Sequence, residues 1–238
     1  MGLPAPTRRE TLHRSLANRS FAIGGTLFLL VVAIALLADL LAPFDPLKSN
    51  FRYRLGAPNA IHWFGTDNFG RDVLSRVLHG SRVSLLIGLL VVTLTGVFGT
   101  LIGAVSGYVR SLDNMIMRIM DGFMAIPAIL LAMGLVSLSR AGVVAVVIAI
   151  VVPEIPRVVR LVRSIVLSIR EEPYVEAAIT VGTPTPTLLW RHVLPNTIAP
   201  LIVQGTFICA SAILVEAVLS FLGIGIPPET PTWGNIMA

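Results

Sequence analysis

The sequence predicts an all-α integral membrane protein. Of its 238 residues, 55% are hydrophobic and only 13% are charged, and the mean hydropathy is +0.83. Soluble domains carry about a quarter charged residues, so a chain this poor in charge must expose much of its surface to lipid. Apolar segments of about 20 residues, the length of helix that crosses a bilayer, also recur along the chain. The length accommodates one membrane domain, with no room for a second sizeable globular module.

The net charge of +5 does not indicate a nucleic-acid-binding protein. Basic residues stand in short groups between apolar runs, as they do in membrane proteins, and form no continuous stripe. The single cysteine, Cys209, lies in an apolar run, so no disulfide can form within the chain.

Five segments are predicted as transmembrane helices, the first of them at residues 21–42 after a cytoplasmic tail, residues 1–20. The tail's arginines resemble the basic start of a signal peptide. However, the apolar stretch that follows is longer than the roughly 7–15 residues of a signal peptide, so we expect a retained helix that Pro43 closes.

The other four predicted spans cover about residues 83–109, 115–138, 142–159 and 197–222. Glycines in the first of these four recur three, four or eight residues apart, a spacing that lets neighbouring helices approach closely; they are Gly88, Gly96, Gly99, Gly103 and Gly107. The next two spans are interrupted. Asp121 and Pro127 lie within residues 115–138, and Pro153, Glu154 and Pro156 are expected to break the later half of residues 142–159.

Residues 43–82 are predicted as an extracytoplasmic loop, and residues 83–238 as the membrane core. From Asp72 onward, Val73, Leu74, Val77 and Leu78 fall on one helical face, which is typical of an interfacial helix lying along the membrane. Trp63 and Phe64 are expected at the level of the lipid headgroups.

The arginines favour a cytoplasmic N-terminus, because cytoplasmic loops of membrane proteins are enriched in basic residues. With that orientation the cytoplasmic side holds eleven basic residues: Arg8, Arg9, Arg14, Arg19, Arg110, Arg118, Arg157, Arg160, Arg163, Arg170 and Arg191. The opposite side holds seven: Lys48, Arg52, Arg54, Arg71, Arg76, Arg82 and Arg140.

The largest predicted cytoplasmic element covers about residues 160–196. Its first part, residues 174–181, is expected to be a short helix in which Ala177 and Ala178 leave room for another surface to lie close. Gly182 follows and permits the backbone conformation of a sharp turn. Thr183 and Pro184 then suit the cap and first position of a second helix, which Leu194-Pro195 is expected to end. Such a projecting helix–turn–helix suits docking into a groove on a partner.

This arrangement resembles the EAA loop of permease subunits in ATP-binding-cassette importers: Glu-Ala-Ala, three residues, Gly, nine residues, an apolar residue, one more, and Leu-Pro. His192 stands where the general pattern has an apolar residue, a departure that the dipeptide, oligopeptide and nickel branch tolerates. Further segments that look like this branch, and like the second permease of its pair, are residues 65–76, 80–85, 174–178 and 219–223.

The resemblance implies a type I importer permease fold with six spans, so a sixth is expected beyond Ala238. It also implies that the EAA loop docks on an ATPase subunit and transmits its closure to the permease helices, a role carried by Glu176, Ala177, Ala178, Gly182, Thr185, His192, Leu194 and Pro195. The implied partners are a second permease, two ATPase subunits, an extracytoplasmic binding protein and the lipid of a bacterial inner membrane. Di- and oligopeptides lead as cargo, and nickel chelates or another small solute stay open.

No enzyme activity is predicted for this chain. A phosphate-cradling P-loop needs Gly-Lys followed by Ser or Thr, whereas the only lysine, Lys48, follows Leu47. ATP and Mg²⁺ are therefore expected on partner subunits. The histidines are scattered and form no metal-binding spacing, so no cofactor or metal site is expected here.

Three acidic residues fall within the last three predicted spans, where each costs about 2.5–3.5 kcal/mol at the bilayer centre. Glu154 is expected near the cytoplasmic end of its helix and Asp121 near the start of its own, both in structural ion pairs. Glu216 is a candidate for the translocation path, although packing between two permeases is an equal alternative. A secondary transporter or channel without ATPase partners remains the competing function, and a membrane-embedded enzyme is a third.

Overall fold

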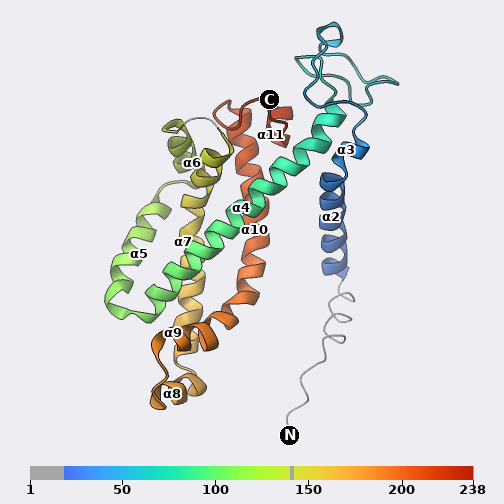
Figure 1. Ribbon diagram of the computed structural model, residues 1–238. Helices are drawn as coiled ribbons and strands as arrows, with labels where there is room; N and C mark the ends of the chain where they lie inside the picture. Colours follow the sequence, from blue (N-terminus) through green and yellow to red (C-terminus); the bar gives the residue numbers. More distant parts are fainter. Residues whose placement is uncertain (1–18, 140–141, 238) are drawn as a thin grey trace. The chain divides into compact units, whose positions relative to one another are not determined.

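The computed structural model describes residues 19–139 and 142–237, which are mostly helical (Figure 1). The chain divides into two compact units, residues 1–83 and 84–238. The helices are α2 (Arg19–Leu36), α3 (Ala38–Leu41), η1 (Phe51–Tyr53), α4 (Val73–Tyr108), α5 (Arg110–Ala125), α6 (Ala128–Ser137), α7 (Val143–Arg170), α8 (Pro173–Thr180), α9 (Thr185–Leu188), the π-helical turn η2 (Leu189–Val193), α10 (Leu194–Phe221) and α11 (Trp233–Met237).

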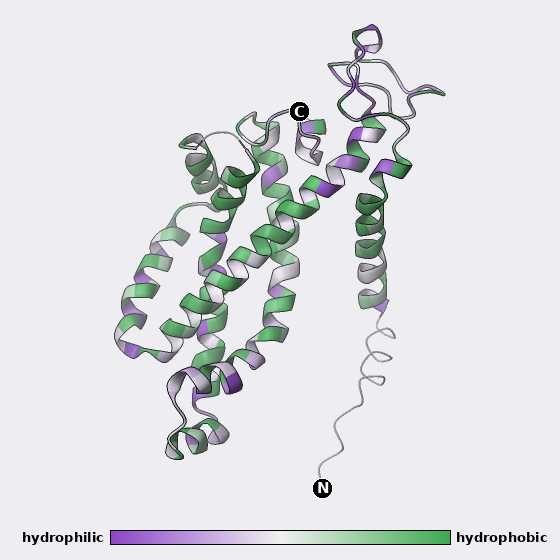
Figure 2. Cartoon of the chain, in the orientation of Figure 1, coloured by the Kyte–Doolittle hydropathy of each residue, from purple (hydrophilic) through white to green (hydrophobic). Residues whose placement is uncertain are grey.

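Three of the described helices are long and apolar enough to cross a membrane: α2, α4 and the run from Thr185 to Phe221 that contains α10. Figure 2 shows apolar residues along most of their length. A fourth candidate is the pair α5 and α6, which passes the same test only as one span bent by 87°. The predicted spans at residues 21–42, 83–109 and 197–222 therefore fall on long apolar helices, whereas the two interrupted spans require correction.

The predicted span at residues 115–138 is two helices. The backbone of Ile126 is extended, with φ −95° and ψ 130°, because the ring of Pro127 disfavours a helical conformation at the residue before it. The break places Asp121 near the C-terminal end of α5, not near the start of a span. There it accepts a hydrogen bond of 2.6 Å from Nη2 of Arg160 on α7.

The predicted span at residues 142–159 is the first part of α7, a helix of 28 residues that runs through both prolines. An unpacked helix would lose about 3 kcal/mol at such a proline. In α7, however, Pro153 and Pro156 are buried within a largely apolar packing surface. The expected break is therefore wrong, and Glu154 lies near the middle of the helix instead of near its end. Glu154 and two arginines in this central part also make α7 less apolar than the three spanning helices.

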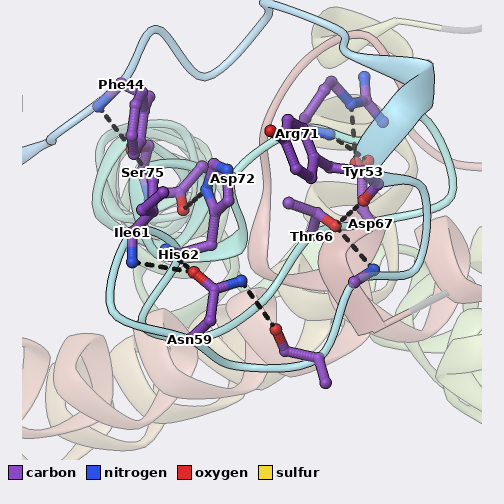
Figure 3. A network of polar contacts seen from close by, with 12 residues as sticks. Phe44, Tyr53, Asn59, Ile61, His62, Thr66, Asp67, Arg71, Asp72 and Ser75 are labelled. Atoms are coloured by element: carbon purple, nitrogen blue, oxygen red, sulfur yellow. Dashed lines mark hydrogen bonds and ion pairs between the residues drawn. The ribbon is translucent and has the colours of Figure 1, made fainter.

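The first unit contains a folded loop between α3 and α4, shown in Figure 3. Asp72 lies at its centre and is 3% exposed. Its carboxylate accepts hydrogen bonds from the backbone N–H and the hydroxyl of Ser75, at 2.8 and 2.7 Å, and lies 2.9 Å from Nδ1 of His62. Asp72 therefore caps the N-terminus of α4. The expected interfacial helix is not a separate element, because α4 continues without a break from Val73 to Tyr108.

A second group of polar contacts in the loop surrounds Asp67. Burial opposes ionisation of this carboxyl group, but hydrogen bonds from the backbone N–H groups of Arg71 and Phe69 and from the Arg71 guanidinium outweigh it. The pKa of Asp67 therefore lies below its ordinary value of 3.8. Two glycines with positive φ, Gly65 and Gly70, close the turns around this carboxylate.

Arg82 joins α2 to the start of α4 within the first unit. Its guanidinium donates to both carboxylate oxygens of Asp39, at 3.0 and 2.9 Å, and to the carbonyl oxygens of Ala35 and Leu36. Those carbonyl groups lie at the C-terminal end of α2, where the helix leaves its last acceptors unsatisfied. Arg82 therefore acts as a side-chain cap and as a tie between the two helices.

In the second unit, α4 packs closely on α7 along a stripe of glycines. A Cβ atom built on Gly99, Gly103 or Gly107 would lie only 2.5–2.9 Å from the Cβ atoms of Val158, Val162 and Val166 respectively. Gly88 similarly faces Cys209 on α10, whereas Gly96 has open space around it. Four of the five glycines thus permit a close helix–helix approach, as their spacing predicts.

Candidate coupling element

The segment at residues 171–196, here called the coupling element, projects from one end of the second unit. Figure 1 shows α8 and α9 at this end and the C-terminal α11 at the opposite end of the same unit. The element begins directly after α7 ends at Arg170 and includes the first three residues of α10, which begins at Leu194. Three buried apolar side chains hold it together: Val175, Leu188 and Val193 are at most 1% exposed. It is therefore a folded protrusion with a small core of its own.

The turn between α8 and α9 depends on Gly182, whose φ is +84°. The N–H of Gly182 donates to the carbonyl oxygen of Ile179 at 2.9 Å, and the N–H of Thr183 donates to that of Ala178 at 3.0 Å. This pair of hydrogen bonds is the Schellman arrangement, in which a left-handed residue closes a helix. The predicted helix and its glycine turn are thus present, with α8 one residue earlier at each end than expected.

The second helix differs from the prediction in two ways. Pro184, not Thr183, occupies the position before the first residue of α9, and no side chain caps it. The helix also does not end at Leu194-Pro195, because η2 leads directly into α10 and Pro195 lies in the first turn of α10. A proline is tolerated there, since the first turn of a helix lacks internal partners for its N–H groups.

The predicted docking residues do not all face outward. Glu176, Ala177 and Thr185 are exposed, and Ala178 is half-buried. His192 is also half-buried: its ring centroid lies 6.1 Å from that of Tyr174, and its carbonyl oxygen accepts a 2.7 Å hydrogen bond from Asn196. We therefore divide the set into outward residues at α8 and the turn, and His192, Leu194 and Pro195 at the junction with α10.

Three large apolar side chains add to the outward surface, and the sequence motif did not single them out. Val181 is 86% exposed, Trp190 is 76% exposed and Ile179 is 48% exposed. Large exposed apolar side chains outside the spanning helices are typical of a contact with a partner. The available signal was Trp190 itself, a large side chain directly before Arg191 and His192.

Glu216 lies far along α10 from the coupling element, and its side chain has no exposed surface. The hydroxyl of Ser220 donates to its carboxyl group at 2.8 Å and itself accepts the backbone N–H of Ile226 at 3.2 Å. Gly234 of α11 packs against the next residue of α10, since a Cβ there would lie 2.7 Å from Cα of Ala217. This surrounding favours a packing role for Glu216 over a place on the wall of the path.

Within the described ranges, 19–139 and 142–237, no three metal-ligating side chains come together. The coupling element likewise offers a surface and a turn, not a set of reactive groups. Its geometry suits mechanical contact with another protein.

Comparison with protein families decides the class of the chain. Residues 96–238 match the family described as binding-protein-dependent transport system inner membrane component, and residues 7–58 match the N-terminal transmembrane domain of oligopeptide transport permease C. The chain belongs to the first of these families. It is an all-α membrane permease of the ATP-binding-cassette transporters, in which the ATPase activity lies in other subunits.

Curated relatives agree with this assignment. A probable peptide ABC transporter permease of Sinorhizobium fredii is 52% identical over 216 residues, which cover 91% of this chain and 74% of the relative. The dipeptide transport system permease DppC of Alkalihalophilus pseudofirmus is 39% identical over 97% of this chain and 76% of its own length. The di/tripeptide permease DppC of Pseudomonas aeruginosa is 41% identical, covering 98% of this chain and 80% of the relative. The resemblance drawn from the EAA motif is therefore confirmed.

Proposed function

We propose that this permease imports short peptides across a bacterial inner membrane, and that its coupling element docks on an ATPase subunit. Similarity to relatives named for peptide, dipeptide and di/tripeptide transport supports the cargo class. The complete assembly contains a second permease, two ATPase subunits that bind ATP and Mg²⁺, and an extracytoplasmic binding protein. Specificity among peptides lies largely in that binding protein.

The orientation in this proposal places the N-terminus, residues 1–20, and the coupling element in the cytoplasm. The loop at residues 43–82 lies outside, and residues 83–238 form the permease core. The distribution of arginines, eleven against seven, supports this arrangement.

The observation that carries the docking role is the exposed Gly182 turn. A Cβ built on Gly182 meets no atom within 4 Å, and the small Ala177 and the apolar Val181 flank the turn on the outside. An apolar protrusion with a fixed backbone suits a groove on a partner, because little conformational entropy is lost on docking. Closure of the ATPase then moves α8 and α9, which are continuous with α7 and α10.

Cross-linking in the assembled complex tests the proposal. With Cys209→Ala as background, Thr185→Cys should form a cross-link to an ATPase subunit. Glu229→Cys is the matched control, because Glu229 is also exposed but belongs to the segment between α10 and α11, and α11 lies at the opposite end of the second unit. A cross-link from the Glu229 position alone, or from neither position, would contradict the docking role of the coupling element.

A further inference from the structure

The exposed face of α7 is unusual for a helix of a membrane protein. α7 has one face of valines packed on the glycines of α4, as described above. Another face carries Arg157, Arg160, Ser164, Ser168 and the following Glu171, which recur three or four residues apart and are all exposed. Residues at that spacing lie above one another on a helix. The polar strip therefore runs from the middle of α7 to the coupling element.

The polar strip begins at Arg157, in the middle of α7. Arg157 is fourteen residues after Val143 and thirteen before Arg170, so about 20 Å of helix extends on either side of it. A charged side chain that follows the apolar first half of α7, on the way to the cytoplasmic end, avoids lipid and faces protein or water. The side chains of Arg157 and Arg160 are nevertheless 41% and 45% exposed.

Neighbouring helices contribute to the same surface. Nη2 of Arg160 lies 2.6 Å from the carboxylate of Asp121 on α5, whose side chain is 59% exposed. The Arg157 guanidinium lies 5.9 Å from the centroid of the Phe207 ring on α10, and Nη1 lies 3.3 Å from both carboxylate oxygens of the buried Glu154. Each arginine is thus already paired within the second unit, and the surface is polar without a large net charge.

We propose that this surface, defined by Asp121, Arg157, Arg160, Ser164 and Phe207, forms the inner wall of the cargo path on its way to the cytoplasm. The inference rests on the proposed import of peptides and names residues for it. Cargo must bind the wall of a path strongly enough to enter it and weakly enough to leave it. Paired opposite charges on the wall meet both needs for a zwitterionic dipeptide. They replace water at the carboxylate and ammonium groups of the dipeptide, and the wall carries no uncompensated charge that would hold the dipeptide in place. Arg157 provides the donor for the carboxylate group.

Thiol accessibility tests whether the surface faces water. In the Cys209→Ala background, Phe207→Cys should react with a charged, membrane-impermeant thiol reagent in the assembled complex, and excess dialanine with its binding protein should slow the reaction. Phe98→Cys is the matched control, since Phe98 is an exposed phenylalanine in an apolar stretch of α4; it should stay unreactive. Absence of reaction at Phe207→Cys in every nucleotide state would mean that a second permease covers this surface, and would overturn the proposal. Reaction without protection by the dipeptide would overturn it as well.

Cargo chemistry provides an independent readout. Arg157→Gln should lower transport of dialanine on the order of tenfold, the effect of losing one charge-assisted hydrogen bond, whereas transport of dialanine amide should change little. Arg157→Lys should restore part of the difference, and the Thr185→Cys cross-link to the ATPase should form in both variants. Equal losses for the two cargoes would contradict a role at the carboxylate group. Absence of the Thr185→Cys cross-link in a protein that retains Arg157 would instead reject the proposed docking role.

Discussion

The loop at residues 43–72 and the coupling element at residues 171–196 are both polar excursions from apolar helices, yet they are built in opposite ways. The loop satisfies its polar groups internally: Asp72 is 3% exposed, and Asp67 accepts three hydrogen bonds from nearby residues. The coupling element buries only a few apolar side chains and presents Val181 and Trp190 almost fully to the outside.

This difference indicates where each region obtains its stability. Buried charged groups stabilise a fold only when every partner is present, so the loop is a rigid structure with little tolerance of change. A surface that leaves apolar side chains exposed gains stability when a partner covers them. Substitutions in the loop should therefore reduce the amount of folded protein, whereas substitutions in the coupling element should reduce its response to ATPase subunits.

The largest contrast is expected between two glycines with positive φ. At Gly70 a built Cβ would lie 1.9 Å from the carbonyl oxygen of Asn50, whereas at Gly182 it meets nothing within 4 Å. Gly70→Val combines backbone strain with this clash and should destabilise the first unit by about 3 kcal/mol or more. Gly182→Val adds only the strain of a side chain at positive φ, about 1–2 kcal/mol at the turn.

The yield and thermal unfolding of the purified permease measure the first effect, and ATPase co-purification and cargo-stimulated hydrolysis measure the second. Gly96→Val is a control, because Gly96 has free space and no positive φ. If the assembled complex with Gly182→Val hydrolyses ATP and transports cargo normally, the turn has no coupling role. Normal folding of Gly70→Val would show that the loop is more adaptable than its contacts indicate.

A smaller contrast is expected between two carboxylates. Asp72→Asn removes the charge that accepts from both groups of Ser75 and contacts His62, and should cost about 1.5–3 kcal/mol. Glu176 is exposed on α8, so Glu176→Gln should change the unfolding free energy by less than about 0.5 kcal/mol. Its effect should appear only as weaker stimulation of ATP hydrolysis by cargo. Equal loss of thermal stability in the two variants would remove the distinction between the regions.

An ion pair between α7 and α5 connects the end of the second unit that carries the coupling element with the other helices. Arg163 near the end of α7 donates two 2.6 Å hydrogen bonds to Asp113 of α5, and Ser106 of α4 donates to the same carboxylate at 2.6 Å. This contact joins three helices at the end of the unit that carries α8. A double-mutant cycle of Asp113→Ala and Arg163→Ala should give a coupling energy of about 1–3 kcal/mol. Additive effects would show that motion of α7 reaches α4 and α5 by another route.

Sequence reasoning predicted the elements that depend on local chemistry. The spacing of Gly99, Gly103 and Gly107 indicated a close helix contact, and Gly182 indicated a turn with positive φ, because few other residues adopt that backbone conformation. The prolines were less informative. Pro127 breaks its helix and Pro153 does not, because packing of α7 offsets the lost hydrogen bond, and packing is a tertiary property.

The exposure of individual charged side chains could also not be predicted from the sequence. Glu216 and Arg157 are both charged residues in apolar surroundings, yet one is fully buried and the other is half-exposed over Phe207. Only the arrangement of α7, α10 and α11 distinguishes them. The loop network was missed for the same reason, since the contact between His62 and Asp72 depends on how the intervening residues fold.

The smallest expected effect is a pH dependence of the loop. The folded pKa of Asp67 lies below its ordinary value of 3.8, so the unfolded loop binds more protons than the folded loop in the acid range. The contribution of Asp67 to stability is therefore fully present above that value and is lost as the pH falls through the folded pKa. Hydrogen exchange of the Phe69 and Arg71 amides, corrected for intrinsic rates, should show protection that declines as the pH falls below about 4. In Asp67→Asn the protection should be lower throughout and independent of pH over this range. A parallel decline in the two proteins would assign the pH dependence to another group, and no decline in either would show that the hydrogen bonds to Asp67 contribute little to holding the loop closed.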